Sequence, residues 1–344
     1  MDETQLLSAR LVQLLEREVD GADAVRIENL QRAGAGSSTE NWLFDASWSV
    51  HGQSHHEALV LRRAPASEVV VASRTTEFAL LQALANRGIP APRAWWMDHD
   101  GSLFGRPAMV LQRCTGRADR QMLTGRNAAG LGVPARTALA AQMVDVLCAI
   151  HAIPVAALRA QWGEVAARGV TARQAILNCE AGFLPLETVP SPEMRLAAWW
   201  LRDHLPAAPG REVLVHGDFR PANMLVEGGH LSAVLDWELA HCGDPAQDLG
   251  WYLAPVYRAE HFIAGSWTPR DFLQRYESRT GTTVDRQALR FWSVFALFQL
   301  AGIAIATAHG FLHGDATRLL LFPHPLMAQL MRAISDDVDF QDLL

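Results

Sequence analysis

Lysine is absent from this sequence, and all 30 of its basic residues are arginine. Any site that needs a cation must therefore use a guanidinium group, which is planar and grips carboxylates or phosphates through two parallel hydrogen bonds. The arginines form no block, and the formal charge is −7 with a pI near 6.0. This charge pattern argues against a general nucleic-acid binder, so we expect no nucleic-acid partner.

Cysteine is scarce, and its spacing excludes the usual cysteine-based sites. The four cysteines are scattered and form neither a CxxC pair nor a metal-binding pattern: Cys114, Cys148, Cys179 and Cys242. We expect reduced, structural thiols. The sequence also contains no HExxH motif or multi-histidine ligand set, which disfavours a metal hydrolase.

Residues 1–20 lack the basic-then-apolar pattern of a targeting signal. They contain acidic residues and an amphipathic helical pattern of leucines, so we expect a soluble, cytoplasmic protein. One stretch, Phe291–Ala308, has no formal charge over eighteen residues. It is short for a membrane span and contains Ser293, Gln299 and Thr307, so we interpret it as a buried helix and expect no membrane partner.

The strongest signal is the segment His216-Gly217-Asp218-Phe219-Arg220-Pro221-Ala222-Asn223, followed by Asp236-Trp237-Glu238. Short apolar runs flank these polar residues, which places them on turns between small strands. An Asp, an Asn five positions later and a second Asp after a strand match the needs of kinase chemistry. One carboxylate takes the proton of the acceptor hydroxyl, while the amide and the other carboxylate hold Mg²⁺ on ATP.

The segments VLVHGDFRPANMLV and AVLDWELAHCGDPAQDLGW resemble the aminoglycoside phosphotransferase and choline kinase family, which has a protein-kinase-like fold. Their residues most resemble those of the branch whose kinase-like domains are attached to some acyl-CoA dehydrogenases. The resemblance implies an α+β, bilobal fold. We expect an N-terminal nucleotide-binding lobe over 1–113, with a small antiparallel sheet and one long helix, and a larger, mainly helical catalytic and substrate-binding lobe over 114–344.

The resemblance and the chemistry together suggest roles in the second lobe. Asp218 is expected to act as base or orienter for the acceptor hydroxyl, and His216 to brace the loop by hydrogen bonding or to pack as a structural residue. Asn223 and Asp236 are expected to hold Mg²⁺. Glu238 could be a further carboxylate near the metal or a surface residue.

The first lobe needs groups that contact the phosphates of ATP. The glycine-containing loop with Gly34, Gly36, Ser37 and Ser38 lies between two apolar runs and could cradle phosphates, although such a turn is weak evidence alone. The strand Ala58–Arg63 ends in arginines where the family has lysine. We expect Arg62 to replace that lysine, and Arg63 to point to the opposite face of the strand.

The following helix, about Glu68–Arg87, offers Glu77 as the partner that orients Arg62, with a solvated salt bridge as the plain alternative. Adenine is expected to lie against the strand Met109–Leu111 and to exchange hydrogen bonds with the backbone from Leu111 to Arg113. Asp244 and Asp248, ahead of a short helix, look like capping and bracing residues.

Six further helices are expected at about 136–151, 192–205, 246–252, 269–279, 286–309 and 325–335. The segment Thr115–Val133 is expected to be an irregular linker, because it is rich in glycine and polar residues.

The acceptor is the least determined part of the function. Only eleven residues separate Asp236 from Asp248, too few for a long peptide-docking segment, so we expect a small-molecule hydroxyl as substrate. Aminoglycosides would want an acidic rim, which Glu238 and the acidic C-terminal tail could supply. The branch resemblance favours a hydroxyacyl-CoA or hydroxy acid, whose anionic groups would match the arginines of the second lobe. A nucleotide-binding pseudokinase that regulates a partner is the alternative, and oligomeric state is open.

Overall fold

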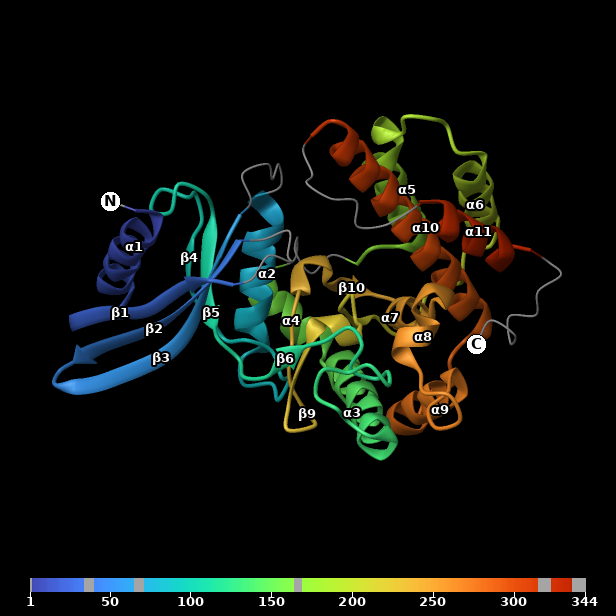
Figure 1. Ribbon diagram of the computed structural model, residues 1–344. Coiled ribbons are helices and arrows are strands. Elements are labelled where there is room, and N and C mark those ends of the chain that lie inside the picture. Colours follow the sequence, from blue (N-terminus) through green and yellow to red (C-terminus); the bar gives the residue numbers. More distant parts are fainter. Residues whose placement is uncertain (1, 34–39, 65–70, 164–168, 315–322, 336–344) are drawn as a thin grey trace. The chain divides into compact units, whose positions relative to one another are not determined.

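The computed structural model describes residues 2–33, 40–64, 71–163, 169–314 and 323–335. They form two compact units (Figure 1). The first unit is Met1–Gly116 with Ser232–Glu238, and the second is Arg117–Leu231 with Leu239–Leu344. The sequence placed a single boundary near Cys114, whereas the chain returns to the first unit for the short segment that contains Asp236.

The first unit is built on a five-stranded antiparallel sheet with the strand order β1-β2-β3-β5-β4 (Figure 1). Its strands are β1 (Ala22–Arg32), β2 (Glu40–Val50), β3 (Gln53–Arg63), β4 (Ala94–Asp98) and β5 (Ala108–Gln112). Two helices accompany it, α1 (Glu3–Glu18) and α2 (Val71–Leu84). This is the small sheet with one long helix expected from the sequence, with α1 added.

The N-terminal helix covers one face of this sheet. It begins at Asp2, whose side chain accepts the N–H of Gln5 in a capping box. The leucines of α1 pack in one apolar cluster with the side chains of alternate β3 residues, Leu59 and Leu61. Because side chains alternate along a strand, Arg62 must lie on the other face of β3 and Arg63 on the face of α1.

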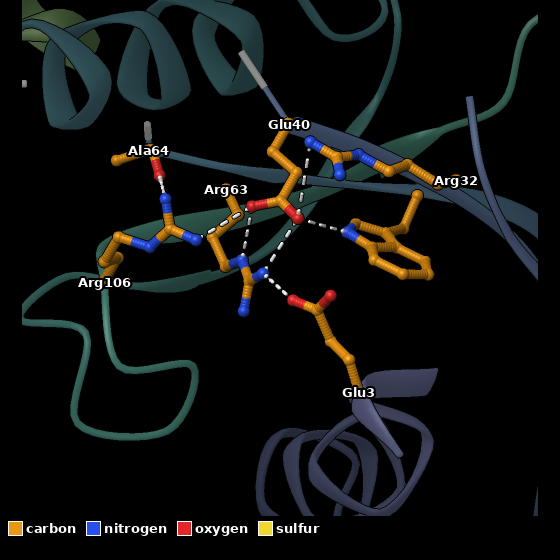
Figure 2. Close-up of polar contacts among 7 residues, drawn as sticks. Glu3, Arg32, Glu40, Arg63, Ala64 and Arg106 are labelled. Atoms are coloured by element: carbon orange, nitrogen blue, oxygen red, sulfur yellow. Dashed lines mark hydrogen bonds and ion pairs between the residues drawn. The ribbon is translucent and has the colours of Figure 1, made fainter. Parts of the chain in front are cut away.

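A largely buried carboxylate, that of Glu40, links several side chains at this end of the sheet (Figure 2). It accepts hydrogen bonds from Arg63 Nε at 3.0 Å, Arg106 Nη2 at 2.9 Å and Trp42 Nε1 at 3.1 Å. Arg63 also donates to Glu3 of α1 at 2.6 Å, which confirms that it points away from the face of Arg62. Burial would raise the pKa of Glu40, but the hydrogen bonds from Arg63 and Trp42 lower it below its usual range.

The second unit is mainly helical. Its helices are α3 (Val133–Ala152), α4 (Val155–Trp162), α5 (Ala172–Phe183), α6 (Pro192–Asp203), α7 (Ala246–Leu253), α8 (Arg258–His261), α9 (Pro269–Thr280), α10 (Arg286–Leu312) and α11 (Pro323–Ala333). Its short strands form a sheet in the order β6 (Arg117–Ala118), β8 (Met224–Glu227) and β9 (His230–Val234), and an antiparallel pair of β7 (Val213–Val215) with β10 (His241–Gly243). Strand β9 carries the chain back to the first unit.

Helix α10 is the centre of this unit's core. It packs with α5, α6, α7 and α11 in one apolar cluster. Among the described residues, α3 and α10 are long and apolar enough to cross a membrane, but 72% of the most apolar window of α10 is buried in the protein. The expected buried helix is confirmed, since the core accounts for its composition. Gly250 of α7 allows the closest approach, because a Cβ there would lie 2.6 Å from the backbone of Trp292.

Candidate active site

The loop after β7 carries the predicted catalytic residues of the second unit. The strand Val213–Val215 is fully buried, and the chain turns sharply after it at Gly217, which has φ of 85°. A Cβ at Gly217 would lie 2.7 Å from the carbonyl oxygen of Leu239, so both the conformation and the space require glycine. A short 3₁₀ turn, η2 (Pro221–Asn223), then returns Asn223 toward Asp218.

Asp218 is held by three side chains of its own unit. Asn223 Nδ2 donates to Oδ2 at 2.7 Å, and Trp251 Nε1 of α7 donates to Oδ1 at 2.9 Å. Arg220 forms an ion pair with Oδ1, with Nε at 2.9 Å. The side chain keeps 18% of its surface exposed, so the oriented carboxylate stays accessible to a substrate.

The amide of Asn223 is oriented by the same loop. Its Nδ2 donates both to Asp218 Oδ2 and to the Asp218 backbone carbonyl, the latter at 3.0 Å. Both amide hydrogens are thereby used, which leaves the oxygen Oδ1 as the group that Asn223 can offer to a cation. An amide oxygen is a suitable ligand for Mg²⁺.

Buried Asp248 fixes the backbone of this loop. Its carboxylate accepts the N–H of His216 at 2.8 Å, the N–H of Gly217 at 2.9 Å and His151 Nε2 of α3 at 3.0 Å. Burial alone would raise the pKa of Asp248, but the hydrogen bond and charge interaction with His151 and the His216 N–H hold it below its usual range. The expected capping role is therefore corrected: Asp248 is the third residue of α7 and braces the catalytic loop instead of its own helix.

Two further residues of this network, His151 and Tyr276, were not assigned a role from the sequence. Tyr276 of α9 contacts His151 Nδ1 through its hydroxyl at 2.7 Å. His216 is fully buried and accepts the N–H of Asp218 at Nδ1, at 3.2 Å, so it braces the loop as expected. Because Asp248 can only accept a hydrogen bond from His151 Nε2, the Tyr276 hydroxyl donates to Nδ1 when the imidazole is neutral.

The first unit holds the groups expected to meet phosphates. Arg62, on the face of β3 away from α1, donates through Nη1 to Glu77 Oε1 of α2 at 2.8 Å. Its Nη2 lies 3.3 Å from Asp236 Oδ1. Both Arg62 and Glu77 are buried, which holds the guanidinium in place. Asp236 has a positive φ of 59° and a half-exposed side chain, a conformation that costs energy in a non-glycine residue and often marks a functional position.

The carboxyl group of Glu238 lies among other acidic groups. Its pKa is raised, first by partial burial around its carboxyl group and then by the carboxylates of Glu77 and Asp236, although the residue as a whole is exposed. Nothing in this setting removes Glu238 as a metal ligand, so its place near the metal stays a prediction.

The side-chain oxygens of Asn223, in the second unit, and of Asp236, in the first, are each of the kind that a hard cation such as Mg²⁺ takes as ligands. Over the described part of the chain, no three His, Cys, Asp or Glu side chains cluster as a metal site. The joint role of Asn223 and Asp236 in holding Mg²⁺ stays a prediction.

The remaining predicted nucleotide contacts fall in three places. Gly34, Gly36, Ser37 and Ser38 lie outside the described residues. Leu111 is buried in β5. Arg113 forms an ion pair with Asp45, and its N–H donates to the Ala58 carbonyl at 2.8 Å, while the N–H of Gln112 donates to Arg93. These two amides are already bonded inside the first unit, so adenine contacts at Leu111 and Arg113 stay a prediction.

An oriented Asp on a loop between short strands, an Asn five residues later and a buried Arg–Glu pair on an antiparallel sheet define a phosphotransferase of the protein-kinase-like fold. The chain belongs to the Phosphotransferase enzyme family, whose profile matches residues 30–292. This confirms the resemblance drawn from the two sequence segments around Asp218 and Asp236.

Among known proteins, the chain is 30% identical over 224 residues to acyl-CoA dehydrogenase family member 10 of Mus musculus, covering 62% of this chain and 20% of that protein. It is 26% identical over 279 residues to family member 11 of Rattus norvegicus, covering 76% of this chain and 35% of that protein. The chain thus spans only about a fifth to a third of the length of these relatives.

Solved structures confirm the fold. A putative aminoglycoside phosphotransferase from Ralstonia eutropha superposes with a TM-score of 0.71 at 22% identity, covering 95% of this chain and 97% of that one. Aminoglycoside phosphotransferase APH(4)-Ia, in a ternary complex with ADP and hygromycin B, gives a TM-score of 0.61 at 15% identity, covering 94% and 96%.

Proposed function

We propose that this protein is an ATP- and Mg²⁺-dependent kinase that moves the γ-phosphate to a hydroxyl group of a small molecule. The acceptor favoured by the relatives is a hydroxyacyl-CoA or a hydroxy acid, rather than an aminoglycoside. The observation that carries the proposal is Asp218, whose two carboxylate oxygens receive hydrogen bonds from Asn223 and Trp251 while the side chain stays accessible.

Asp218 would orient the acceptor hydroxyl and take its proton as the phosphoryl group transfers. Two hydrogen bonds fix the direction of its lone pairs, so little reorganisation is needed when the substrate arrives. Asp248 adds to this by holding the loop backbone at His216 and Gly217.

Arg62 would neutralise phosphate oxygens, oriented by Glu77. Its contact with Asp236 keeps the first unit's charges paired before a nucleotide arrives. Asn223 and Asp236 would hold Mg²⁺, which when bound neutralises charge on the transferring phosphate. The buried Arg62–Glu77 pair supports phosphate binding by a chain that contains no lysine.

The acceptor class is supported by the likeness to acyl-CoA dehydrogenase family members 10 and 11. An acyl-CoA carries several phosphate charges, which suit a protein whose cations are all arginine. Because APH(4)-Ia binds hygromycin B, aminoglycosides are the competing class of acceptor and are included in the test.

The test is an ADP-release assay with Mg-ATP against 3- and 4-hydroxyacyl-CoAs, hydroxy acids, sugars, choline-like amino alcohols and aminoglycosides, with Asp218→Ala as the blank. We expect a hit among the hydroxyacyl compounds that disappears in the blank, while ATP affinity persists because the base acts on the acceptor. Activity in Asp218→Ala equal to wild type would refute the assignment. ATP binding without turnover across the panel would favour the pseudokinase alternative.

A further inference from the structure

A pocket of about 610 Å³ opens in the second unit, outside the residues assigned above to catalysis. Its lining comes from the turn 123–125, the first turn of α3, the segment 258–264 and the start of α9 at 267–269. Its size falls within the range of small-molecule sites, roughly 300–1,000 Å³. The whole turn 123–125 belongs to the segment Thr115–Val133, which the sequence marked only as an irregular linker.

The pocket walls are apolar. Leu123, Ile263 and Trp267 are buried beneath it, and Phe262 and Val133 complete the apolar lining. Such walls suit a hydrocarbon chain, because moving its CH₂ groups out of water stabilises the bound state.

The charged side chains that line the pocket are all positive. Arg136 and Arg258 line the pocket, and no Asp or Glu is among its described lining residues. Arg136 donates through Nη1 to the Leu123 carbonyl at 2.9 Å, which anchors its guanidinium at the wall. Within the described part of the chain Arg136 has no carboxylate partner, and its buried Nε has no hydrogen-bond partner. A half-buried cation without a carboxylate partner is suited to an anionic ligand.

Two chains of contacts connect the pocket wall with the catalytic loop. Arg220, paired with Asp218, lies with its Cζ 5.9 Å from the ring centre of Tyr257, the residue before Arg258. Phe219 contacts Tyr252 at a ring separation of 6.2 Å, and Tyr252 contacts Phe262 at 5.8 Å. Only the side chains of Arg220 and Tyr257 therefore separate Asp218 from Arg258 at the pocket wall.

We propose that this pocket binds the apolar chain and the anionic group of an amphipathic organic anion, and so selects the acceptor of the phosphotransfer reaction. The pocket's role in selecting the acceptor rests on the proposed function, whereas ligand binding to the pocket can be tested without phosphoryl transfer. Polycationic compounds are disfavoured here, because they would face two guanidinium groups with no carboxylate in the lining.

The experiment measures binding to the Asp218→Ala protein, in which no turnover interferes, by calorimetry and by quenching of tryptophan fluorescence. The probes share an eight-carbon chain and differ in the end group: octanoate, octyl phosphate, octanol and octylamine. We expect the two anions to bind, octanol to bind more weakly and octylamine not to bind. The stronger of the two anions identifies a carboxylate or a phosphate as the preferred group.

Arg136→Gln should weaken binding of the anions about tenfold, because a charge-assisted hydrogen bond is lost. Arg126→Gln is the matched control, since Arg126 is exposed on the neighbouring turn and does not line the pocket. Val133→Asp adds a carboxylate at a residue that is 43% exposed, so folding should survive. That variant should reject octanoate and admit octylamine.

Equal binding of octylamine and octanoate, or equal effects of Arg136→Gln and Arg126→Gln, would overturn the proposal. Its failure can be told apart from failure of the kinase assignment. Anion binding with no ADP release across the acceptor panel would leave the pocket standing and remove the kinase function. An aminoglycoside hit with unchanged kinetics in Arg136→Gln would leave the kinase standing and remove the anion pocket.

Discussion

Replacing Asp248 by Asn should disable the catalytic loop without changing the size of the side chain. Oδ1 accepts one hydrogen bond, from Gly217, and Oδ2 accepts two, from His216 and His151. The variant will place its oxygen where two donors meet and its NH₂ group against the N–H of Gly217. One buried donor loses its partner at a cost of about 1–3 kcal/mol, and two charge-assisted bonds become neutral at a cost of about 1 kcal/mol each. The expected loss of unfolding free energy is therefore about 3–5 kcal/mol.

The pH dependence of this loss follows from the lowered pKa of Asp248. A carboxyl whose folded pKa lies below its unfolded value, about 3.9, stabilises the protein above that value. This stabilisation falls away as the pH drops through the folded pKa. The stability gap between wild type and Asp248→Asn should thus be full at pH 7 and shrink below about pH 4.

Asp244→Asn is the matched control for Asp248→Asn. Asp244 is also buried and accepts the N–H of Ala246 and the indole N–H of Trp292, but it does not touch the catalytic loop. Burial raises its pKa, so losing the charge relieves part of the cost of burying it. One of its two donors will face the NH₂ group of the Asn, so we expect a loss of about 1–3 kcal/mol, smaller than in Asp248→Asn, and unchanged kcat. Urea unfolding at pH 7 and at about pH 3, with kcat measured on the folded fractions, tests both. Equal losses in the two variants would refute the role of Asp248.

Four other variants test three separate parts of the structure. Arg62→Lys should keep partial activity if the cation only neutralises phosphates, whereas Arg62→Ala should raise the Kd for ATP; an unchanged Kd would mean that the wrong cation was assigned. Glu40→Gln should lower the unfolding free energy by about 1–3 kcal/mol at pH 7, because buried Arg63 loses one of its two carboxylate partners and keeps only Glu3. Because the pKa of Glu40 is lowered by folding, urea unfolding should show this loss shrinking as the pH falls below the unfolded value of about 4.3. Tyr276→Phe should cost about 1 kcal/mol through the lost bond to His151, with a smaller drop in kcat than Asp248→Asn, as steady-state kinetics can determine.

Helix positions were predictable where the chain carries strong start signals. Ser191-Pro192, Thr268-Pro269 and Asp285 cap α6, α9 and α10, and these helices begin where the sequence placed them. Helices α4, α5 and α8 were missed. Helices α4 and α8 are only eight and four residues long, and α5 buries only three residues, Ala175, Ile176 and Phe183. The α+β class and the strand carrying Arg62 followed from periodicity and from the family resemblance.

Part of the candidate site could be predicted from the sequence, because Asp218, Asn223 and Asp236 lie in two short motifs with a typical spacing. The bonds of Asp218 to Trp251 and of Asp248 to His151 join residues 33 and 97 positions apart, and only folding brings them together. The same holds for Gln112 and Arg113, whose amides looked available in the sequence but are bonded to neighbouring segments.

The short return of the chain to the first unit has a practical consequence for anyone who separates the halves. A fragment cut after Gly116 would lack Asp236 and Glu238, so buried Arg62 would keep Glu77 as its partner and lose the second carboxylate that it contacts. A fragment that begins at Arg117 would carry those seven residues, Ser232–Glu238, away from the sheet they accompany. Cutting the gene at the apparent border therefore divides one folding unit in two, and co-expression or a permuted chain is the route to an intact nucleotide half.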